Sequence, residues 1–472
     1  MHAEDSVYSG PNGIEIAFTD QPITGWGGLS LVARFFEVLG VRQVLAKALP
    51  DGRTSPNQVP VVDMAMALLV TILMGGRRFS HVERFRSDPV LPKMFDLSRT
   101  ASAMTITRYF GGFTKRHVQH LVEAVGQALW ERLIPADPVA VLDLDSTIFE
   151  RYGQQEGSLK GHNPRKHGRP SHHPILAMLA GSKRVLHAWL RSGNTGTARG
   201  AEGFLDEALH RLAAHTKVQT VRADSGFFIS DFLAHLEARG LKYAVAVRMQ
   251  PPIRRAIAGV QSWRSFGRGV EVCELPWQPF RWTAPRRLVV VRELLRERPD
   301  AAGRRLFDLP GYTFHAVVTN LSVAAPEEIW RFYNGRADCE NRIKELKLDF
   351  AADGFCLRSF QGTEAVLQLN CLLFNLLMAF KDEVLQDPSP TLGTLRHSLF
   401  VLGGLLRASA RRSRLFLGLL TQKTRYHLKQ LLLRLAAIPP TVAHLNLDLP
   451  PPWRNHPSIP AGFLRYCPLA PA

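Results

Sequence analysis

The sequence contains few cysteines, and none of them is spaced as part of a pair. Five cysteines occur in 472 residues, and no two of them form a Cys-x-x-Cys motif. An odd number without paired spacing argues against both a disulfide framework and a structural zinc site. Reduced thiols in a reducing compartment are the simpler interpretation. The five are Cys273, Cys339, Cys356, Cys371 and Cys467.

The sequence also lacks an uninterrupted apolar run long enough to cross a membrane. The two longest apolar stretches, 59–76 and 366–380, are interrupted by an aspartate in the first and by three amides in the second. Both predict core helices of a globular protein. The first ten residues have neither a basic start nor an apolar segment, so no secretory signal is visible. We expect a cytoplasmic protein without a membrane partner.

Acidic side chains are scarce relative to basic ones. Against 41 Asp and Glu stand 59 Lys and Arg, which gives a formal net charge of +18 and a pI near 10.1. This excess is spread along the chain and predicts a polyanionic partner, nucleic acid before an anionic membrane surface. Hydrophobic residues make up 46% of the chain, which is typical of a globular protein of several domains.

Residues 1–136 are predicted to form a helical domain that binds DNA. Segment 102–113 begins with small hydroxyl residues and continues to Arg108, which suits a short helix whose N-terminus meets a phosphate. A purely structural helical bundle is the alternative. Apolar residues recur at three- and four-residue spacing in the other predicted helices, at 28–40, 60–76 and 117–133.

Residues 137–250 change to strand periodicity and predict the first part of an α/β core. In 139–149 two sets of side chains alternate between the faces of a strand, one of them containing Asp143 and Asp145. Sequential strands followed by strands separated by helices predict a mixed sheet with helices on its faces. The further elements are two strands and then helix, strand, helix and strand, at 175–181, 184–193, 201–214, 218–226, 228–240 and 242–249.

The rest of the chain is predicted to interrupt this core and then complete it. Residues 251–316, rich in Trp, Arg and Pro, predict a β-rich insertion whose last strand can return to the main sheet. Residues 317–385 supply the second part of the core, including a helix at 333–347. Residues 386–472 are basic and predict a helical C-terminal region, for example at 407–420.

Three acidic residues stand where phosphoryl transfer needs them. Asp145 and Asp224 end predicted strands, and sites in open α/β sheets form beyond the carboxyl ends of strands. Glu340 lies on the predicted helix that follows. Two hard cations held by such carboxylates can activate a water or 3′-hydroxyl for in-line displacement. Asp143 is either an accessory group or a buried acid paired with a basic neighbour.

The predicted helix 333–347 gathers cations and one aromatic around its glutamate. At 100° per residue, one arc of about 60° holds four side chains, and they are Tyr333, Arg336, Glu340 and Lys347. Lys344 lies beside them. The cations can grip the phosphates of a DNA strand lying across the site. A solvated helix face with intrahelical ion pairs is the competing interpretation.

A connection rich in Gly, Lys and His, at 157–174, follows the first predicted strand. Because no cysteine is near and several cations compete, a loop that tracks phosphates is a better interpretation than a metal cluster of its histidines. The cations predicted to contact DNA here are Lys160, Arg165, Lys166 and Arg169.

These motifs together resemble a known family. The pattern Y-x2-R-x3-E-x6-K in 333–347 is similar to the signature around the catalytic Glu of DDE transposases of the IS4-related groups. The segments LDLDST at 142–147, GHNPRKHGRPSHHP at 161–174 and RADSGF at 222–227 resemble the IS1380-type insertion-sequence transposases. The resemblance implies an RNase H-like catalytic core and a metal-binding triad formed by the two strand-end aspartates and the helix glutamate.

The resemblance also implies a cofactor and partners. The triad of Asp145, Asp224 and Glu340 would bind Mg²⁺ in a two-metal site, in which Mn²⁺ can substitute. The implied partner is double-stranded DNA, as terminal inverted repeats and target sites, bound by a homodimer in a synaptic complex in a bacterial cytoplasm. In related transposases an aromatic of the β insertion holds a flipped base. The candidates here, each with core packing as the alternative, are Trp263, Trp277 and Trp282.

The resemblance predicts a transposase that binds terminal inverted repeats and catalyses cleavage and strand transfer of the cut-and-paste type. Two other interpretations keep the same residues. One is an RNase H-like nuclease without strand transfer, and the other is a non-enzymatic DNA-binding protein with a degenerate core. Short terminal inverted repeats around the gene favour the transposase, whereas an absence of Mg²⁺-dependent nicking favours the DNA-binding protein.

Overall fold

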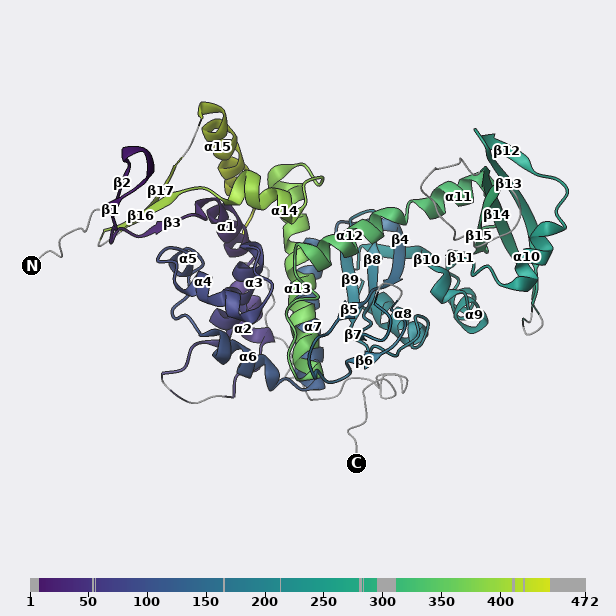
Figure 1. Ribbon diagram of the computed structural model, residues 1–472, viewed down its shortest axis with the longest axis horizontal. Helices are drawn as coiled ribbons and strands as arrows, with labels where there is room; N and C mark the ends of the chain where they lie inside the picture. The colour runs from purple at the N-terminus through teal and green to yellow at the C-terminus, as the bar shows by residue number, and fades with distance from the viewer. Residues whose placement is uncertain are drawn as a thin grey trace, which may run out of the picture. The chain divides into compact units, whose positions relative to one another are not determined.

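The computed structural model describes residues 8–441, apart from 53–54, 56, 164–165, 213, 280–281, 283, 295–310, 410–411 and 419–420. Two units make up the chain in Figure 1. Unit 1 is Met1–Tyr109 with Ala379–Leu445, and unit 2 is Phe110–Met378 with Asn446–Ala472. The segments before and after the predicted core therefore share one unit, and the helix predicted at 117–133 belongs to the other.

Unit 1 is built mainly of helices, as the apolar spacing in the first third of the chain predicts. Helix α3 is buried at every position. Its one charged residue, Asp63, accepts hydrogen bonds from Arg42 and from the backbone and hydroxyl of Ser98, which satisfies the buried carboxylate. The helices of this unit are α1 (Ser30–Val38), α2 (Val41–Ala48), α3 (Val61–Leu73), α4 (Val82–Arg86), α5 (Leu91–Met94), α6 (Ala103–Gly111), α14 (Leu392–Leu395) and α15 (Gln422–Ala437).

Unit 1 also holds two small sheets, and one of them corrects a prediction. The helix predicted at 407–420 is wrong, because this segment contains half of an antiparallel hairpin. Its side chains alternate between two faces, and a third strand from the start of the chain pairs with the hairpin, so strand periodicity decides the structure. The strands are β1 (Tyr8–Ser9) with β2 (Glu15–Ile16), and β3 (Ile23–Thr24) with β16 (Gly404–Ala408) and β17 (Ser413–Leu417).

Unit 2 contains a mixed sheet of nine strands among the described residues. Strand β4 pairs with β8 in antiparallel fashion and with β10 in parallel, and β10 pairs with β11 in parallel. The predicted meander that continues into a parallel half is therefore confirmed. In spatial order the strands are β12 (Arg264–Gly267), β13 (Val270–Trp277), β14 (Arg286–Leu294), β15 (Tyr312–Thr319), β11 (Lys242–Ala246), β10 (Thr216–Ala223), β4 (Asp137–Ser146), β8 (Ile175–Leu179) and β9 (Arg184–Trp189).

The β-rich segment extends this sheet instead of forming a separate one. Strand β15 pairs with β11 on one side and with β14 on the other, so its predicted return to the main sheet is confirmed. Strands β13 and β12 continue outward from β14. The segment opens with a helix that was not predicted, α10 (Pro251–Ala258).

Helices cover the sheet, and one of them closes its β9 edge. The side chain of Asn375 accepts from the Val185 N–H at 2.8 Å and donates to the Val185 carbonyl at 2.7 Å, which replaces the pairing of a further strand. Helix Phe360–Leu385 has the length and hydropathy of a membrane span, but 89% of its most apolar window is buried, as the core-helix prediction requires. The helices are α7 (Lys115–Leu133), α8 (Ala201–His210), α9 (Ser230–Ala238) and α13 (Phe360–Phe380).

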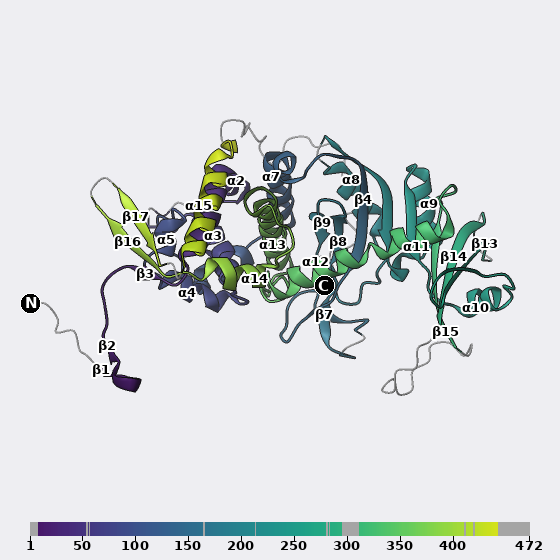
Figure 2. The ribbon, with the colours of Figure 1, turned by 90° about the horizontal axis from the view of Figure 1, so that it is seen from above.

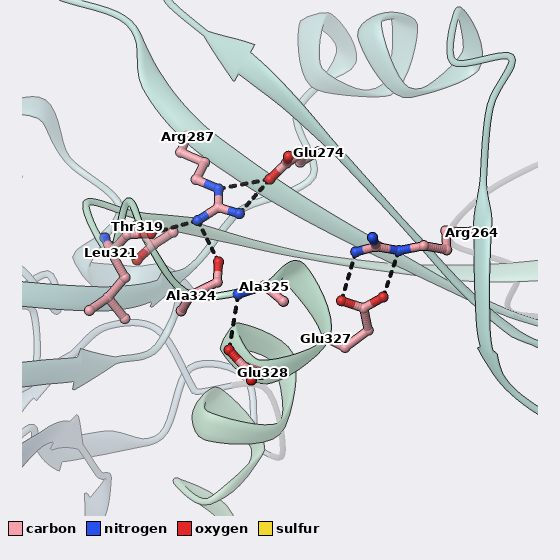
Figure 3. Close-up of polar contacts among 9 residues, drawn as sticks. All are labelled: Arg264, Glu274, Arg287, Thr319, Leu321, Ala324, Ala325, Glu327 and Glu328. Atoms are coloured by element: carbon pink, nitrogen blue, oxygen red, sulfur yellow. Dashed lines mark hydrogen bonds and ion pairs between the residues drawn. The ribbon is translucent and has the colours of Figure 1, made fainter.

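Helix α11 (Pro326–Asn334) is fixed to the sheet at its N-terminal end (Figure 3). Arg287 of β14 pairs with Glu274 of β13 at 2.5 Å and donates to two carbonyls of the connection into α11, at 2.6 and 2.8 Å. Arg264 of β12 pairs with Glu327 of α11 at 2.6 Å. These contacts set the position from which the chain continues to α12 (Ala337–Leu348).

Candidate active site

Two aspartates lie at the carboxyl ends of neighbouring parallel strands. Asp145 is the second-last residue of β4, and Asp224 directly follows β10. Asp145 accepts a hydrogen bond from the Ser146 N–H at 2.8 Å, and Asp224 accepts one from the Gly226 N–H at 2.9 Å. The structure thus places both carboxylates at one end of the sheet, where ligands of α/β proteins bind.

The third acid, Glu340, is connected to this place through one arginine. The Arg336 side chain is only 5% exposed, and its guanidinium contacts Asp145 Oδ1 at 2.9 Å and Glu340 Oε1 at 2.6 Å. Glu340 itself is 60% exposed and lies on α12. An arginine between two carboxylates stabilises a charge arrangement that would otherwise be repulsive.

The pKa values reflect how closely these charges are gathered. Burial raises the pKa of Asp145 to about 7, Arg336 opposes this change, and the charges of Asp224 and Glu340 add to it. Burial also disfavours the charge of Arg336, but its acidic neighbours, Asp145 first, outweigh burial and raise the pKa of Arg336. The three acids therefore share one electrostatic environment, which is typical of a functional site.

The single helix predicted around Glu340 is broken, and the break has a physical cause. Helices α11 and α12 are separated by Gly335 and Arg336. In a continuous α-helix the Phe332 carbonyl would accept from the Arg336 N–H. Instead Arg222 Nη1 donates to that carbonyl at 2.7 Å, and the Arg336 N–H turns to the Tyr333 carbonyl at 2.9 Å. A Cβ on Gly335 would lie 2.5 Å from Arg222 Nη1, so a larger residue there would displace this guanidinium nitrogen.

Asp143 holds the arginine that causes this break. Its two oxygens accept from Arg222 Nε and Nη2 at 2.7 and 2.8 Å, and both side chains are buried. Burial raises the pKa of Asp143, and the hydrogen bonds from Arg222 oppose this change. Of the two roles predicted for Asp143, the buried acid with a basic partner is confirmed.

The donor set fits a hard divalent cation, although Arg336 competes for it. Carboxylate oxygens are the ligands that Mg²⁺ and similar ions prefer. Within the described part of the chain, no three Asp, Glu, His or Cys side chains lie close enough together to hold a metal ion. Because Arg336 engages two of the three acids, these would converge on a cation only after the guanidinium moves.

The other side chains of the predicted helix face have separate surroundings. Lys344 is exposed on α12. Lys347 donates to the Ile148 carbonyl, just beyond β4, at 2.8 Å. Tyr333 belongs to α11, stacks on Trp330 with ring centroids 6.1 Å apart, and has its pKa raised by burial. The residues of the predicted arc are therefore divided between α11, α12 and the break at Arg336, and their contacts with DNA remain predictions.

The basic connection after β4 exposes a cluster of cations around an aromatic. Tyr152 is 71% exposed, and its hydroxyl accepts from Lys166 Nζ at 3.0 Å. The Arg169 guanidinium lies 4.6 Å from the Tyr152 ring centroid. Lys160 is exposed in a small sheet whose strands are β5 (Phe149–Glu150), β6 (Leu159–Lys160) and β7 (Pro170–His172). Arg165 lies outside the described residues.

Two histidines of this connection serve the structure of the site. Burial lowers the pKa of both His172 and His173 to about 4, so both rings are neutral at pH 7. His172 contacts Arg151 Nε at 2.9 Å. His173 contacts the hydroxyl of Ser146 at 3.1 Å, and Ser146 is the residue whose N–H binds Asp145. The sequence did not single out His173, because nothing in its spacing separates it from its neighbours.

Arg108, the phosphate contact predicted in unit 1, is exposed in the last turn of α6. The helix begins as predicted, since the Thr105 N–H donates to the Ser102 hydroxyl at 3.2 Å. A phosphate bound at the N-terminus of α6 remains a prediction.

The three candidate tryptophans lie in different places. Trp282 packs on Phe228, four residues after Asp224, with ring centroids 5.4 Å apart. Trp263 covers Arg292 at 4.3 Å, and Trp277 ends β13. Of the three, Trp282 has the contact that links it to the segment of a predicted catalytic acid.

The chain was compared with families of known proteins, with solved structures and with curated proteins. Residues 8–439 match the family model described as transposase DDE domain group 1. Among solved structures, the chain is similar to the piggyBac transposase in a cryo-EM structure of its synaptic complex with hairpin DNA. That similarity has 12% sequence identity and a TM-score of 0.43, and it covers 81% of this chain and 82% of the other. No curated protein matches the chain.

Proposed function

The chain belongs to the family of transposases with a group 1 DDE domain, and on that premise we propose that it is an insertion-sequence transposase of the IS1380 group. It binds terminal inverted repeats as a homodimer and catalyses cut-and-paste cleavage and strand transfer from an RNase H-like core. The observation that carries this proposal is that Arg336 links Asp145, at the carboxyl end of β4, to Glu340 of α12, while Asp224 follows the neighbouring parallel strand β10 and adds to the same electrostatic environment.

In the proposed mechanism Asp145, Asp224 and Glu340 would hold the cations, Mg²⁺ or in its place Mn²⁺. Two bound cations would activate the attacking hydroxyl and stabilise the leaving oxygen. The Ser146 N–H keeps one oxygen of Asp145 oriented. Because burial raises the pKa of Asp145 to about 7, only the fraction of this carboxyl that is protonated at neutral pH would have to lose its proton before binding a cation. Lys344 remains available to a phosphate of the bound strand.

The test is to incubate the purified full-length chain with Mg²⁺, a duplex ending in the inverted repeat that flanks the gene, and a target plasmid. Sequenced products should show cleavage at the repeat end and its joining to the target. Cleavage without joining would favour the RNase H-like nuclease. Binding without Mg²⁺-dependent nicking would favour the DNA-binding protein with a degenerate core, and either result would contradict the proposal.

Replacing Arg336 by Met is expected to tighten Mn²⁺ binding to the DNA-free protein by about tenfold, because a cation that engages two of the three ligands is removed. Calorimetric titration at pH 8.5, where Asp145 is ionised, measures this affinity. The matched control is Arg342→Met on α12, since Arg342 pairs with Asp338 and Glu345 and not with the triad. Unchanged or weaker binding in Arg336→Met would show that the arginine does not compete with the metal.

A further inference from the structure

A stretch of the C-terminal region that follows the core carries only positive charge. Residues 388–447 contain nine Lys and Arg and no Asp or Glu. A protein surface of one charge sign creates a strong local potential and attracts a polyanion. Segment 407–420 was predicted to be a helix, which does not place its arginines on a hairpin. The structure now places part of it on the hairpin β16–β17.

The hairpin has an anchored base and a free end. Strand β3 pairs only with Gly404 and Leu405 at the start of β16. The next residue, Leu406, donates its N–H to the Pro22 carbonyl at 3.0 Å. Within the described residues β16 and β17 then pair only with each other, at Arg407 opposite Arg414 and at Ala408 opposite Ser413, over roughly 7 Å of strand. Figure 2 shows β16 and β17 continuing past β3 as a two-stranded ribbon.

The base of the hairpin is held by close backbone contacts within unit 1. The Gly27 N–H donates to the Leu402 carbonyl at 2.7 Å. A Cβ on Gly28 would lie 1.9 Å from the Leu399 carbonyl oxygen, so only glycine allows this approach. The ribbon therefore projects from a fixed support, which reduces the entropy lost when a ligand binds to it.

One face of the ribbon carries its arginines. Arg407 and Arg414 are opposite each other in the register, and the Ser409 N–H donates to the Arg412 carbonyl at 2.8 Å, which puts Arg412 on the same face by alternation. Phe416 shares that face and is 45% exposed, and its ring centroid lies 5.4 Å from the Arg407 guanidinium carbon. The three arginines are exposed, and no carboxylate pairs with them within the described part of the chain.

We propose that this arginine ribbon, the face formed by Arg407, Arg412, Arg414 and Phe416, is a double-stranded DNA-binding element. A two-stranded ribbon fits the major groove, and guanidinium groups bind both phosphates and guanine edges. The proposal rests on the proposed function and adds to it a contact surface in unit 1, whereas the three acids lie in unit 2. Its DNA is either the transposon end or the target, and the chemistry of contact is the same.

The test compares two double variants of the full-length chain without metal. Arg407→Gln/Arg414→Gln is expected to weaken duplex binding about tenfold and to reduce the slope of log K against log salt concentration by about 1.8, or 0.9 for each lost phosphate contact. Lys217→Gln/Lys242→Gln removes the same charge from exposed positions near the starts of β10 and β11, at the end of the sheet opposite the acids, and should change the slope by less than about 0.5. Arg412→Gln at the turn is a second, milder variant, expected to lower the slope by about 0.9.

Two duplexes distinguish the source of the DNA. A loss confined to the repeat-bearing duplex assigns the ribbon to the transposon end, and an equal loss on a shuffled duplex assigns it to the phosphates of any DNA, as in target binding. Equal slopes for the wild-type chain and both ribbon variants would overturn the proposal. So would an equal loss in the control pair, or a loss of binding to phosphatidylglycerol vesicles with DNA binding intact. If the wild-type chain binds neither duplex, the proposed function itself fails.

Discussion

Replacing Asp145 by Asn, Asp224 by Asn or Glu340 by Gln is expected to reduce cleavage of a repeat-bearing duplex by at least about 10³-fold. Each change keeps the size of the side chain and removes a charge that would bind a cation. Because each of the three acids would supply its own ligand oxygens to the cations, the remaining two do not replace the one that is lost. Single-turnover rates with saturating Mg²⁺ at pH 8.5 measure the effect.

Asp338→Asn is the matched control for these variants. Asp338 lies on α12 two residues before Glu340, but it pairs with Arg342 at 3.4 Å and is 43% exposed. Its loss should change the cleavage rate by less than about twofold, since a partly exposed pair contributes little. All four variants should bind DNA as the wild-type chain does in EDTA. If one of the three variants cleaves at the wild-type rate, the residue that it replaces does not belong to the triad.

The strand-end acids could be predicted because their signals are local. Alternation over 139–149 indicates a strand, and the order of strands and helices after it fixes which neighbours are parallel. Asp145 and Asp224 then follow from the rule that sites form beyond the carboxyl ends of strands. The family resemblance supplied their roles, which the fold alone does not assign.

The helix break could not be predicted, because a residue far away in the sequence produces it. The hydrogen bond from Arg222 to the Phe332 carbonyl spans 110 residues. Local periodicity continues smoothly through Gly335, and a helical wheel therefore joined Tyr333 to the residues of α12. The sequence does not show that Arg222 lies beside the Phe332 carbonyl, because only the folded sheet brings the two together.

The helix predicted at 407–420 was wrong for a related reason. Segment 407–420 is rich in leucine and arginine, both good helix formers, so propensity favoured a helix. The segment pairs with β16 in a hairpin, and the base of that hairpin, Gly404 and Leu405, pairs with β3 about 380 residues earlier at Ile23–Thr24. Tertiary pairing outweighed propensity there, and the resulting alternation is what places the arginines on one face.

Asp143→Ala is expected to lower the free energy of unfolding by about 3–5 kcal/mol, because Arg222 would keep its charge in a buried place without a partner. The two side chains are 1% and 7% exposed, and they share two hydrogen bonds. Urea denaturation followed by tryptophan fluorescence measures the change. Arg264→Ala is the matched control, since that arginine is 60% exposed in its pair with Glu327 and should contribute at most about 1 kcal/mol.

The double variant Asp143→Leu/Arg222→Met separates stability from positioning. Replacing both partners of a buried pair by apolar side chains restores most of the stability, because no charge is left without a partner. It does not restore the hydrogen bond to the Phe332 carbonyl that keeps α11 and α12 apart. We therefore expect a chain of nearly wild-type stability whose cleavage stays low, because Arg336 and Glu340 then start from a different helix end. If cleavage recovers together with stability, the pair only stabilises the fold and does not position the site.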